Sequence, residues 1–98
     1  MTTLIAAGTP AGGQEEAMGR YLQGALPVLV GAGGKPVKRL RVTQAMAGSS
    51  GLTQILVMDF DNAAALTDAL ASDAYQSLVA DRDVAFSNFE MFITEEMA

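Results

Sequence analysis

The strongest fold signal in the chain lies in residues 54–92, which begin with the run Gln54-Ile55-Leu56-Val57-Met58-Asp59-Phe60. This run predicts a β-strand. Because successive side chains of a strand point to opposite sides of a sheet, its apolar centre, Ile55–Met58, is hydrophobic on both faces. Helices of the same chain can cover one face, but a chain of 98 residues has little left to cover the other. The run therefore predicts a homodimer.

Local patterns in the rest of the chain predict a β-α-β-β-α-β order. The expected elements are a strand at Thr2–Ala7, a helix at Gln14–Val30, strands at Val37–Ala45 and Gln54–Phe60, a helix from Asp61 or Asn62 to about Ala71, helical structure from Ser72 or Asp73 to Phe86, and a strand at Asn88–Thr94. The sequence leaves open whether the last two helical segments are one broken helix or two. This order predicts a single α+β domain with a ferredoxin-like fold, in which helices cover one face of a four-stranded antiparallel sheet.

Three local features refine these expectations. Val37–Ala45 alternates and is half polar, which is typical of a strand at a sheet edge. The stretch Gly8–Gly13 is rich in glycine and predicts a turn. Pro27 lacks a backbone donor and clashes with the preceding helical turn, so we expect a kink or an early break near Gln23–Pro27.

The composition narrows the class of protein. Half of the residues are hydrophobic, 17% are charged and the net charge is −5, which together predict a folded globular domain. A negative chain is a poor partner for nucleic acid or an anionic membrane, so we expect neither. Leu4–Ala7 is too short an apolar run for a signal peptide or a membrane span, and the cytoplasm is the expected location.

The chain contains no cysteine and no histidine. The absence of cysteine excludes a disulfide scaffold, a thiolate nucleophile and a cysteine-based zinc site. The absence of histidine removes the commonest general base and the commonest ligand of transition metals. Gly8–Gly13 also lacks the Lys-Ser or Lys-Thr step of a phosphate-binding loop. We therefore expect no cofactor.

Several short segments resemble a known family. Pro27 lies at an apolar helix end, and Gly33-Gly34-Lys35 follows it. Later come the step Ser72-Asp73-Ala74-Tyr75-Gln76 and the downstream Arg82, in an order similar to that of the small bacterial proteins called domain of unknown function family 1330. The resemblance spans roughly Gly24–Phe92.

The resemblance implies membership of the dimeric α+β barrel superfamily, in which two ferredoxin-like sheets pack face to face. The activity of the family is not established. Relatives in the superfamily include cofactor-independent monooxygenases, haem-degrading enzymes, stress-response barrels and ligand-sensing domains. This chain departs from the enzymes because it has no histidine to bind haem and no tryptophan to assist monooxygenation.

Arg82 is the leading candidate for a functional residue. It falls on the same helical stripe as apolar residues that include Tyr75, so its charge needs a partner or a route to water. One interpretation is structural, with the guanidinium paired to Asp59, to Glu90 or to a main-chain carbonyl. The other is a fork that binds a carboxylate in a cleft between helix and sheet.

Other polar side chains give weaker signals. Arg39 and Arg41 share one face of their strand, either as a charged edge, as part of a salt-bridge rim, or as the basic lining of a pocket at a dimer seam. Tyr21 and Tyr75 can place hydroxyls in a cavity or can be core residues. Asp59 and Asp61 lack a third ligand nearby, so we expect no metal site.

These observations favour a homodimer that binds a small, partly apolar organic molecule, which can be anionic. The candidate binding residues are Arg82, Arg39, Arg41, Tyr75, Tyr21, Asp59 and Glu90. One alternative is a cofactor-independent monooxygenase or isomerase of the same superfamily. The other is a structural or regulatory dimer without a ligand.

Overall fold

The computed structural model describes residues 1–98. The elements, in chain order, are β1 (Thr2–Pro10), α1 (Glu15–Gly31), β2 (Lys35–Arg41), β3 (Gln54–Phe60), α2 (Ala63–Ala71), α3 (Asp73–Gln76), α4 (Val79–Ala85) and β4 (Phe86–Glu95). The predicted β-α-β-β-α-β order is confirmed, with the second helical part divided into three short helices.

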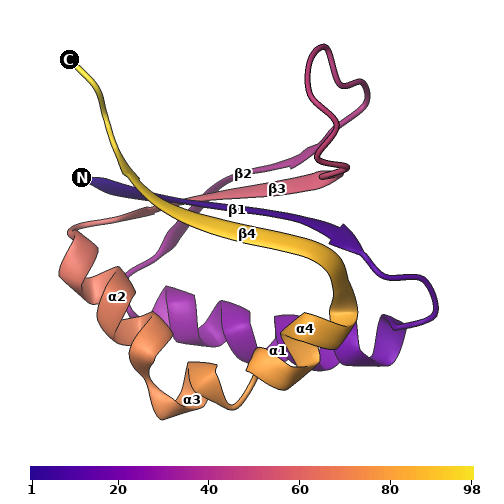
Figure 1. Ribbon diagram of the computed structural model, residues 1–98. Helices are drawn as coiled ribbons and strands as arrows, with labels where there is room; N and C mark the ends of the chain where they lie inside the picture. Colours follow the sequence, from indigo (N-terminus) through magenta and orange to yellow (C-terminus); the bar gives the residue numbers. More distant parts are fainter.

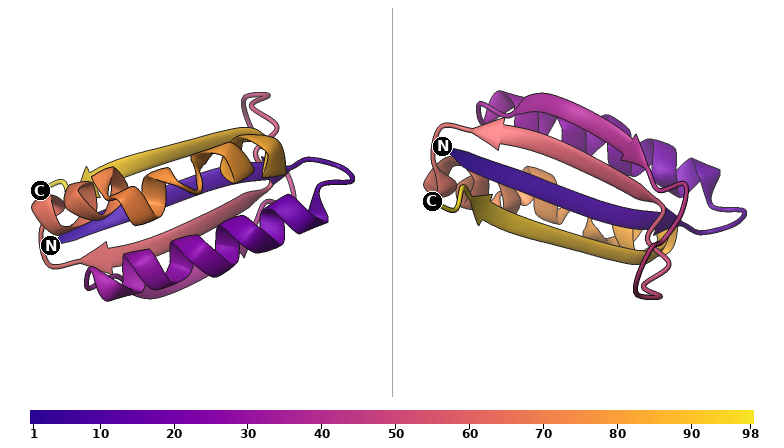
Figure 2. Two further views of the ribbon diagram at one scale, coloured as in Figure 1. Left: turned by 90° about the horizontal axis from the view of Figure 1, so that it is seen from below. Right: turned by 90° about the horizontal axis from the view of Figure 1, so that it is seen from above.

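The four strands form one antiparallel sheet in the order β2-β3-β1-β4, so β1 and β3 are central. All the helices lie on one side of this sheet (Figure 1). Seen from the other side, the strands lie in front and the helices behind them (Figure 2, right). This is the ferredoxin-like arrangement that the sequence predicted.

The strand registers fix which side chains face the helices. Leu4 and Met58 are opposite each other and fully buried, so they mark the helix side of the sheet. One residue further along β1, Ile5 is opposite both Val57 and Phe92, and these three point to the side without helices. The apolar surface on that side, here called the open face, consists of Ile5, Leu40, Ile55, Val57 and Phe92.

The main core cluster lies between the sheet and the helices. Leu4 of β1 and Met58 and Phe60 of β3 pack against Leu29 of α1 and Leu66 of α2. Each of these side chains is at most 4% exposed. Alternation along the strands places them together, because Met58 and Phe60 are two positions apart and so point the same way. This cluster fixes the helices over the end of the sheet where the chain begins.

Strand β1 is longer than predicted, because Gly8 to Pro10 extend it instead of forming a turn. Gly8 is opposite Phe89, and Pro10 pairs with Phe86 after a register shift. A Cβ atom at Gly8 would lie 2.7 Å from the ring of Phe86. Glycine is therefore needed here for close packing of a ring on the strand, and this reason is invisible in the local sequence.

Helix α1 runs without interruption through Pro27, so the expected early break is wrong. Pro27 lies in the last turns of the helix, and both Pro27 and Gln23 are exposed. Proline removes the hydrogen bond to the carbonyl four residues earlier, which is that of Gln23. Because water can reach that carbonyl, the missing bond does not end the helix.

Short side-chain caps divide the second helical part. The side chain of Asn62 accepts a hydrogen bond from the amide of Ala65 at 2.8 Å and begins α2. The hydroxyl of Ser72 accepts from the amide of Tyr75 at 3.2 Å and begins α3. Both side chains fill the N-cap role that favours these residue types. The predicted helix to Phe86 is wrong at its end, since Phe86 already belongs to β4.

Strand β2 lies at the sheet edge, as predicted, but it ends at Arg41. The following loop, residues 42–53, rises on the side of the sheet away from the helices (Figure 1). The amide of Thr53 bonds the carbonyl of Gly8, and the side-chain amide of Asn88 bonds the carbonyl of Ser50. The loop is thus tied to β1 and β4.

Candidate functional site

A cavity of about 420 Å³ lies between α1 and the helix side of the sheet. Of its 18 lining residues, 14 are hydrophobic, and the other four are Gly8, Arg39, Arg41 and Gln54. A volume of this size is in the usual range for small-molecule sites, which is roughly 300–1,000 Å³. The cavity is therefore the first candidate for a binding site.

Helix α1 forms one wall of this cavity. Tyr21, Ala25 and Leu29 recur every four residues and are at most 5% exposed, so this stripe of the helix faces the sheet. Leu22 and Leu26 lie beside the stripe, also line the cavity, and are 37% and 40% exposed. Exposed apolar lining residues mark where the cavity opens to solvent.

Arg39 and Arg41 of β2 form the basic part of the wall. Their register partners on β3 are Leu56 and Gln54, which also line the cavity, so both arginines are on the helix side of the sheet. The pocket that these arginines line is therefore on the helix side of the sheet. Neither arginine makes an ion pair, because the only salt bridges in the structure are Arg20–Asp81 and Arg82–Asp83.

The opposite end of the cavity is aromatic. The ring of Tyr21 packs edge-on against Phe86 and Phe89, with centroid separations of 6.0 and 6.2 Å. Phe86 and Phe89 lie 4.7 Å apart at a tilt of 40°. Such separations are typical of favourable aromatic pairs. The cavity thus has a cationic end on β2 and an aromatic end on β4 and α1.

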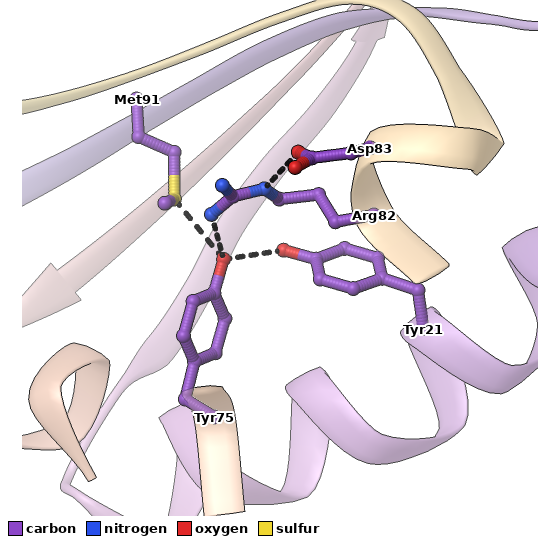
Figure 3. A network of polar contacts seen from close by, with 5 residues as sticks. All are labelled: Tyr21, Tyr75, Arg82, Asp83 and Met91. Atoms are coloured by element: carbon purple, nitrogen blue, oxygen red, sulfur yellow. Dashed lines mark hydrogen bonds and ion pairs between the residues drawn. The ribbon is translucent and has the colours of Figure 1, made fainter. Parts of the chain in front are cut away.

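A buried polar network adjoins the aromatic end (Figure 3). The hydroxyls of Tyr21 and Tyr75 are 2.8 Å apart, and Nη1 of Arg82 donates to the Tyr75 oxygen at 3.2 Å. The Tyr75 hydroxyl also lies 3.9 Å from the sulfur of Met91. Tyr75 is only 1% exposed, so these contacts supply the partners that a buried hydroxyl requires.

Arg82 pairs with groups that the sequence did not single out for it. Its Nε is 3.4 Å from Oδ1 of Asp83, and its guanidinium lies 5.5 Å from the ring centre of Phe89. The expected pairing with Asp59 or Glu90 is wrong. Both of those residues point to the side without helices, opposite Thr3 and Ala7 respectively, whereas Arg82 lies among the helices.

The network shifts two ionisation equilibria. Burial, reinforced by the hydrogen bond to Tyr75, raises the pKa of Tyr21 far above its ordinary value. Burial acts to lower the pKa of Arg82, but the hydrogen bond to Tyr75 and the nearby Asp83 carboxylate outweigh it and raise that pKa. The Tyr21 hydroxyl is therefore neutral and Arg82 a cation throughout the physiological range.

The structure brings five of the seven candidate residues into one region. Arg39, Arg41 and Tyr21 line the cavity, and Tyr75 and Arg82 join it through the Tyr21 hydroxyl. Asp59 lies on the opposite side of the sheet, where it accepts a hydrogen bond of 2.7 Å from Thr3. Glu90 lies on that same side. No group of three or more acidic side chains is placed to hold a metal ion.

The cavity residues that the sequence analysis did not name as candidates include Gln54, Phe86 and Phe89. Phe89 and Met91 are two positions apart in the expected strand Asn88–Thr94, so alternation places both on one side, and this pattern is a signal for Phe89 in the sequence. Phe86 was expected at the end of a helix, on the same stripe as Tyr75 and Arg82, whereas it begins β4. Gln54 is the first residue of its strand. Polar side chains are common at strand ends, so this residue did not indicate a cavity.

Comparison with known families decides the classification. Residues 11–97 match the model of a family described as a domain of unknown function (DUF1330). The chain belongs to the DUF1330 family. This confirms the resemblance seen in the sequence, and the match reaches further toward both ends than Gly24–Phe92. No curated protein sequence matches the chain.

Solved structures share the fold of this DUF1330 protein at low sequence identity. A protein of unknown function from Rhodopseudomonas palustris superposes with a TM-score of 0.80 at 16% identity, covering 99% of this chain and 82% of that one. A protein from Arabidopsis thaliana gives 0.75 at 10% identity, with coverages of 100% and 97%. A protein from Mesorhizobium loti, described as a dabb family protein with a ferredoxin-like fold, gives 0.70 at 18% identity, with coverages of 99% and 97%.

These likenesses establish the ferredoxin-like fold of the DUF1330 protein. They leave the activity to be argued from the cavity, because fold does not determine function. None of the helices combines the length and the hydropathy that crossing a bilayer requires.

Proposed function

We propose that this DUF1330 protein binds a small, partly apolar organic anion in the cavity between α1 and the sheet. The observation that carries this proposal is the chemistry of the wall. Among the 18 lining residues, the only charged side chains are those of Arg39 and Arg41, and no carboxylate is present. A mostly apolar cavity with a few polar groups that fix orientation is typical of small-molecule sites.

The arginine pair supports an anionic ligand. Guanidinium groups present several donors in a planar fork that matches a carboxylate. Arg39 and Arg41 have no carboxylate partner in the chain, so they are free to accept one from a ligand. The side-chain amide of Gln54, the strand partner of Arg41, adds a neutral donor beside them.

The enzyme alternative has less support. Proton abstraction requires a general base within hydrogen-bond reach of the substrate. The chain has no histidine, and the cavity wall has no carboxylate. Burial raises the pKa of Tyr21 strongly, so its hydroxyl stays protonated and is not a general base. An apolar wall whose only charged side chains are two arginines suits binding of an anion better than removal of a proton.

We also propose that the protein works as a homodimer, with a second copy on the open face. Phe92 is 50% exposed there and lies opposite Ile5, and contiguous exposed apolar patches of this kind usually mark interfaces. The molecule is flat, with Cα extents of 35 × 33 × 17 Å. A face of that size exceeds the roughly 800 Å² per partner that a standard interface buries.

A thermal-shift experiment tests the binding proposal. Octanoate and 3-phenylpropionate at about millimolar concentration should raise the melting temperature, because a ligand that binds only the folded state stabilises it. Sodium chloride at equal ionic strength is the control for general salt effects. The double substitution Arg39→Gln/Arg41→Gln should abolish the shift.

The matched control is Lys35→Gln/Lys38→Gln, which removes the same charge from the same strand. Lys35 and Lys38 are opposite Asp59 and Val57, so both lie on the side without helices. This control should keep the shift. An absence of any shift in the wild-type protein, or an equal shift in the Arg39→Gln/Arg41→Gln protein, would contradict the proposal.

A further inference from the structure

The side chains of the sheet that form the floor of the cavity change from polar to aromatic between one sheet edge and the other. One row across the strands runs from Arg41 on β2 through Gln54 on β3 and Gly8 on β1 to Phe89 on β4. The row therefore passes from a cation, through an amide and a residue without a side chain, to an aromatic ring. This order of side chains across the sheet favours one orientation of a bound ligand.

The neighbouring row has the same polarity. It runs from Arg39 through Leu56 and Ala6 to Met91, so its charge is again on β2 and its middle is small and apolar. All of these residues line the cavity. Both rows have their cation on β2 and an apolar side chain on β4. The whole cavity therefore has a cationic end and an apolar end, and neither end depends on a single side chain.

Gly8 brings the aromatic end toward the middle of the sheet. A Cβ atom at this position would lie 2.7 Å from the Phe86 ring and 3.2 Å from the Phe89 ring. The rings therefore lie over β1, two strand spacings or about 10 Å from β2. That span accommodates a six-membered ring joined to an acid group by a short chain.

We propose that the ligand is an arylalkyl carboxylate, held with its carboxylate at Arg39 and Arg41 and its ring against Phe86 and Phe89. This inference deepens the proposed function and rests on it. Tyr21 completes the ring site from α1, since it already packs edge-on against both phenylalanines. A further ring can join such a cluster in the offset or edge-on geometry that aromatic groups prefer.

Isothermal titration calorimetry with three matched probes tests the ligand class. The probe 3-phenylpropionate has the proposed ring and charge. The probe 3-cyclohexylpropionate has the same carbon skeleton and charge without aromaticity, and 3-phenylpropionamide has the ring without the charge. We expect the phenyl acid to bind about 2- to 12-fold more tightly than the cyclohexyl acid, the range that aromatic pairing supplies. The amide should bind more weakly than both acids.

A pair of substitutions locates the ring. Phe89→Leu should bring the ratio between the phenyl and cyclohexyl acids close to one. Phe92→Leu is the matched control on the same strand, because Phe92 points to the open face, and it should keep the wild-type ratio. Circular dichroism of both variants establishes that each is folded before the ratios are compared.

The outcomes separate this inference from the proposed function. If the two acids bind equally in the wild-type protein while Arg39→Gln/Arg41→Gln still abolishes binding, the arylalkyl class is wrong and the anion site stands. A ratio that survives Phe89→Leu likewise overturns the ring position. If neither acid binds at millimolar concentration, both the inference and the proposed function are wrong.

Discussion

The hydroxyl oxygens of Tyr21 and Tyr75 lie 2.8 Å apart in the interior, although 54 residues separate them in the chain. This contact joins α1 to α3 beside the cavity (Figure 3). With Arg82 bonded to the same Tyr75 oxygen, no buried side-chain polar atom of the structure lacks a partner. The pair therefore holds the cavity wall in place without leaving an uncompensated polar group.

Substitution of Tyr21 by phenylalanine should change the alkaline stability of the protein. The pKa of Tyr21 is raised in the folded state above its ordinary value of 10.0, so the unfolded state loses the phenolic proton first. Its contribution to stability is thus complete below about pH 10 and falls above it, by about 1.4 kcal/mol per pH unit. Urea unfolding between pH 8 and 11 measures this slope.

Tyr21→Phe should remove the fall in stability of about 1.4 kcal/mol per pH unit that this hydroxyl causes above about pH 10. At neutral pH the substitution should lower stability by about 1 kcal/mol, because the hydrogen bond to Tyr75 is lost. The position keeps its ring contacts with Phe86 and Phe89, so the fold should persist. Identical alkaline slopes in the two proteins would show that the Tyr21 hydroxyl is not held protonated by its surroundings.

Substitution of Arg82 by methionine should have a modest effect on stability. Its carboxylate partner, Asp83, has a side chain that is 66% exposed, and Tyr75 keeps its contacts with Tyr21 and Met91. We expect a loss of about 1 kcal/mol or less. Chemical unfolding decides the matter, with Asp83→Asn as a control that should change stability by less than about 0.5 kcal/mol. A loss of about 3–5 kcal/mol would instead indicate a stranded buried charge.

Substitution of Gly8 by alanine should destabilise the protein and disturb the aromatic end of the cavity. The added Cβ would meet the Phe86 ring at 2.7 Å, and overpacking of this kind costs about 1–3 kcal/mol. Gly12→Ala is the matched control, since a Cβ there meets nothing within 4 Å. Thermal unfolding of both variants compares them, and equal stabilities would contradict the close packing of Phe86 on β1.

The proposed homodimer predicts a mass of twice 10.2 kDa in light scattering at low micromolar concentration. Val57→Lys places a charge in the middle of the open face and should give the mass of one chain. Thr67→Lys, on the exposed surface of α2, adds the same charge away from that face and should leave the dimer intact. A folded wild-type protein with the mass of a single chain would exclude the dimer.

The sequence predicted the elements whose pattern is local. Ile55–Met58 and the alternation around Met91 gave β3 and β4, and their faces agree with the observed registers. Asn62 was one of two cap residues expected for α2, and it is the one that caps. Periodicity and capping depend on residues a few positions apart, so a single sequence is enough to recognise them.

The errors concern features that depend on distant partners. Gly8 looked like a turn residue because its partner, the Phe86 ring, is 78 positions later. Alternation placed Arg39 and Arg41 on one face, but only the register with β3, which shifts between Pro36 and Lys38, shows that this face is the helix side. The expected pairing of Arg82 with Asp59 or Glu90 failed because both carboxylates lie on the side of the sheet without helices, which only the strand registers show.

The most direct test of the central claim is a titration of the ¹⁵N-labelled protein with 3-phenylpropionate, followed by amide chemical shifts. The account predicts saturable shift changes that cluster at the cavity wall, at Leu22 and Leu26 on α1, Gln54 on β3 and Phe89 on β4, with Val57 on the open face unaffected. Shift changes confined to the open face, or none at millimolar ligand, would contradict it.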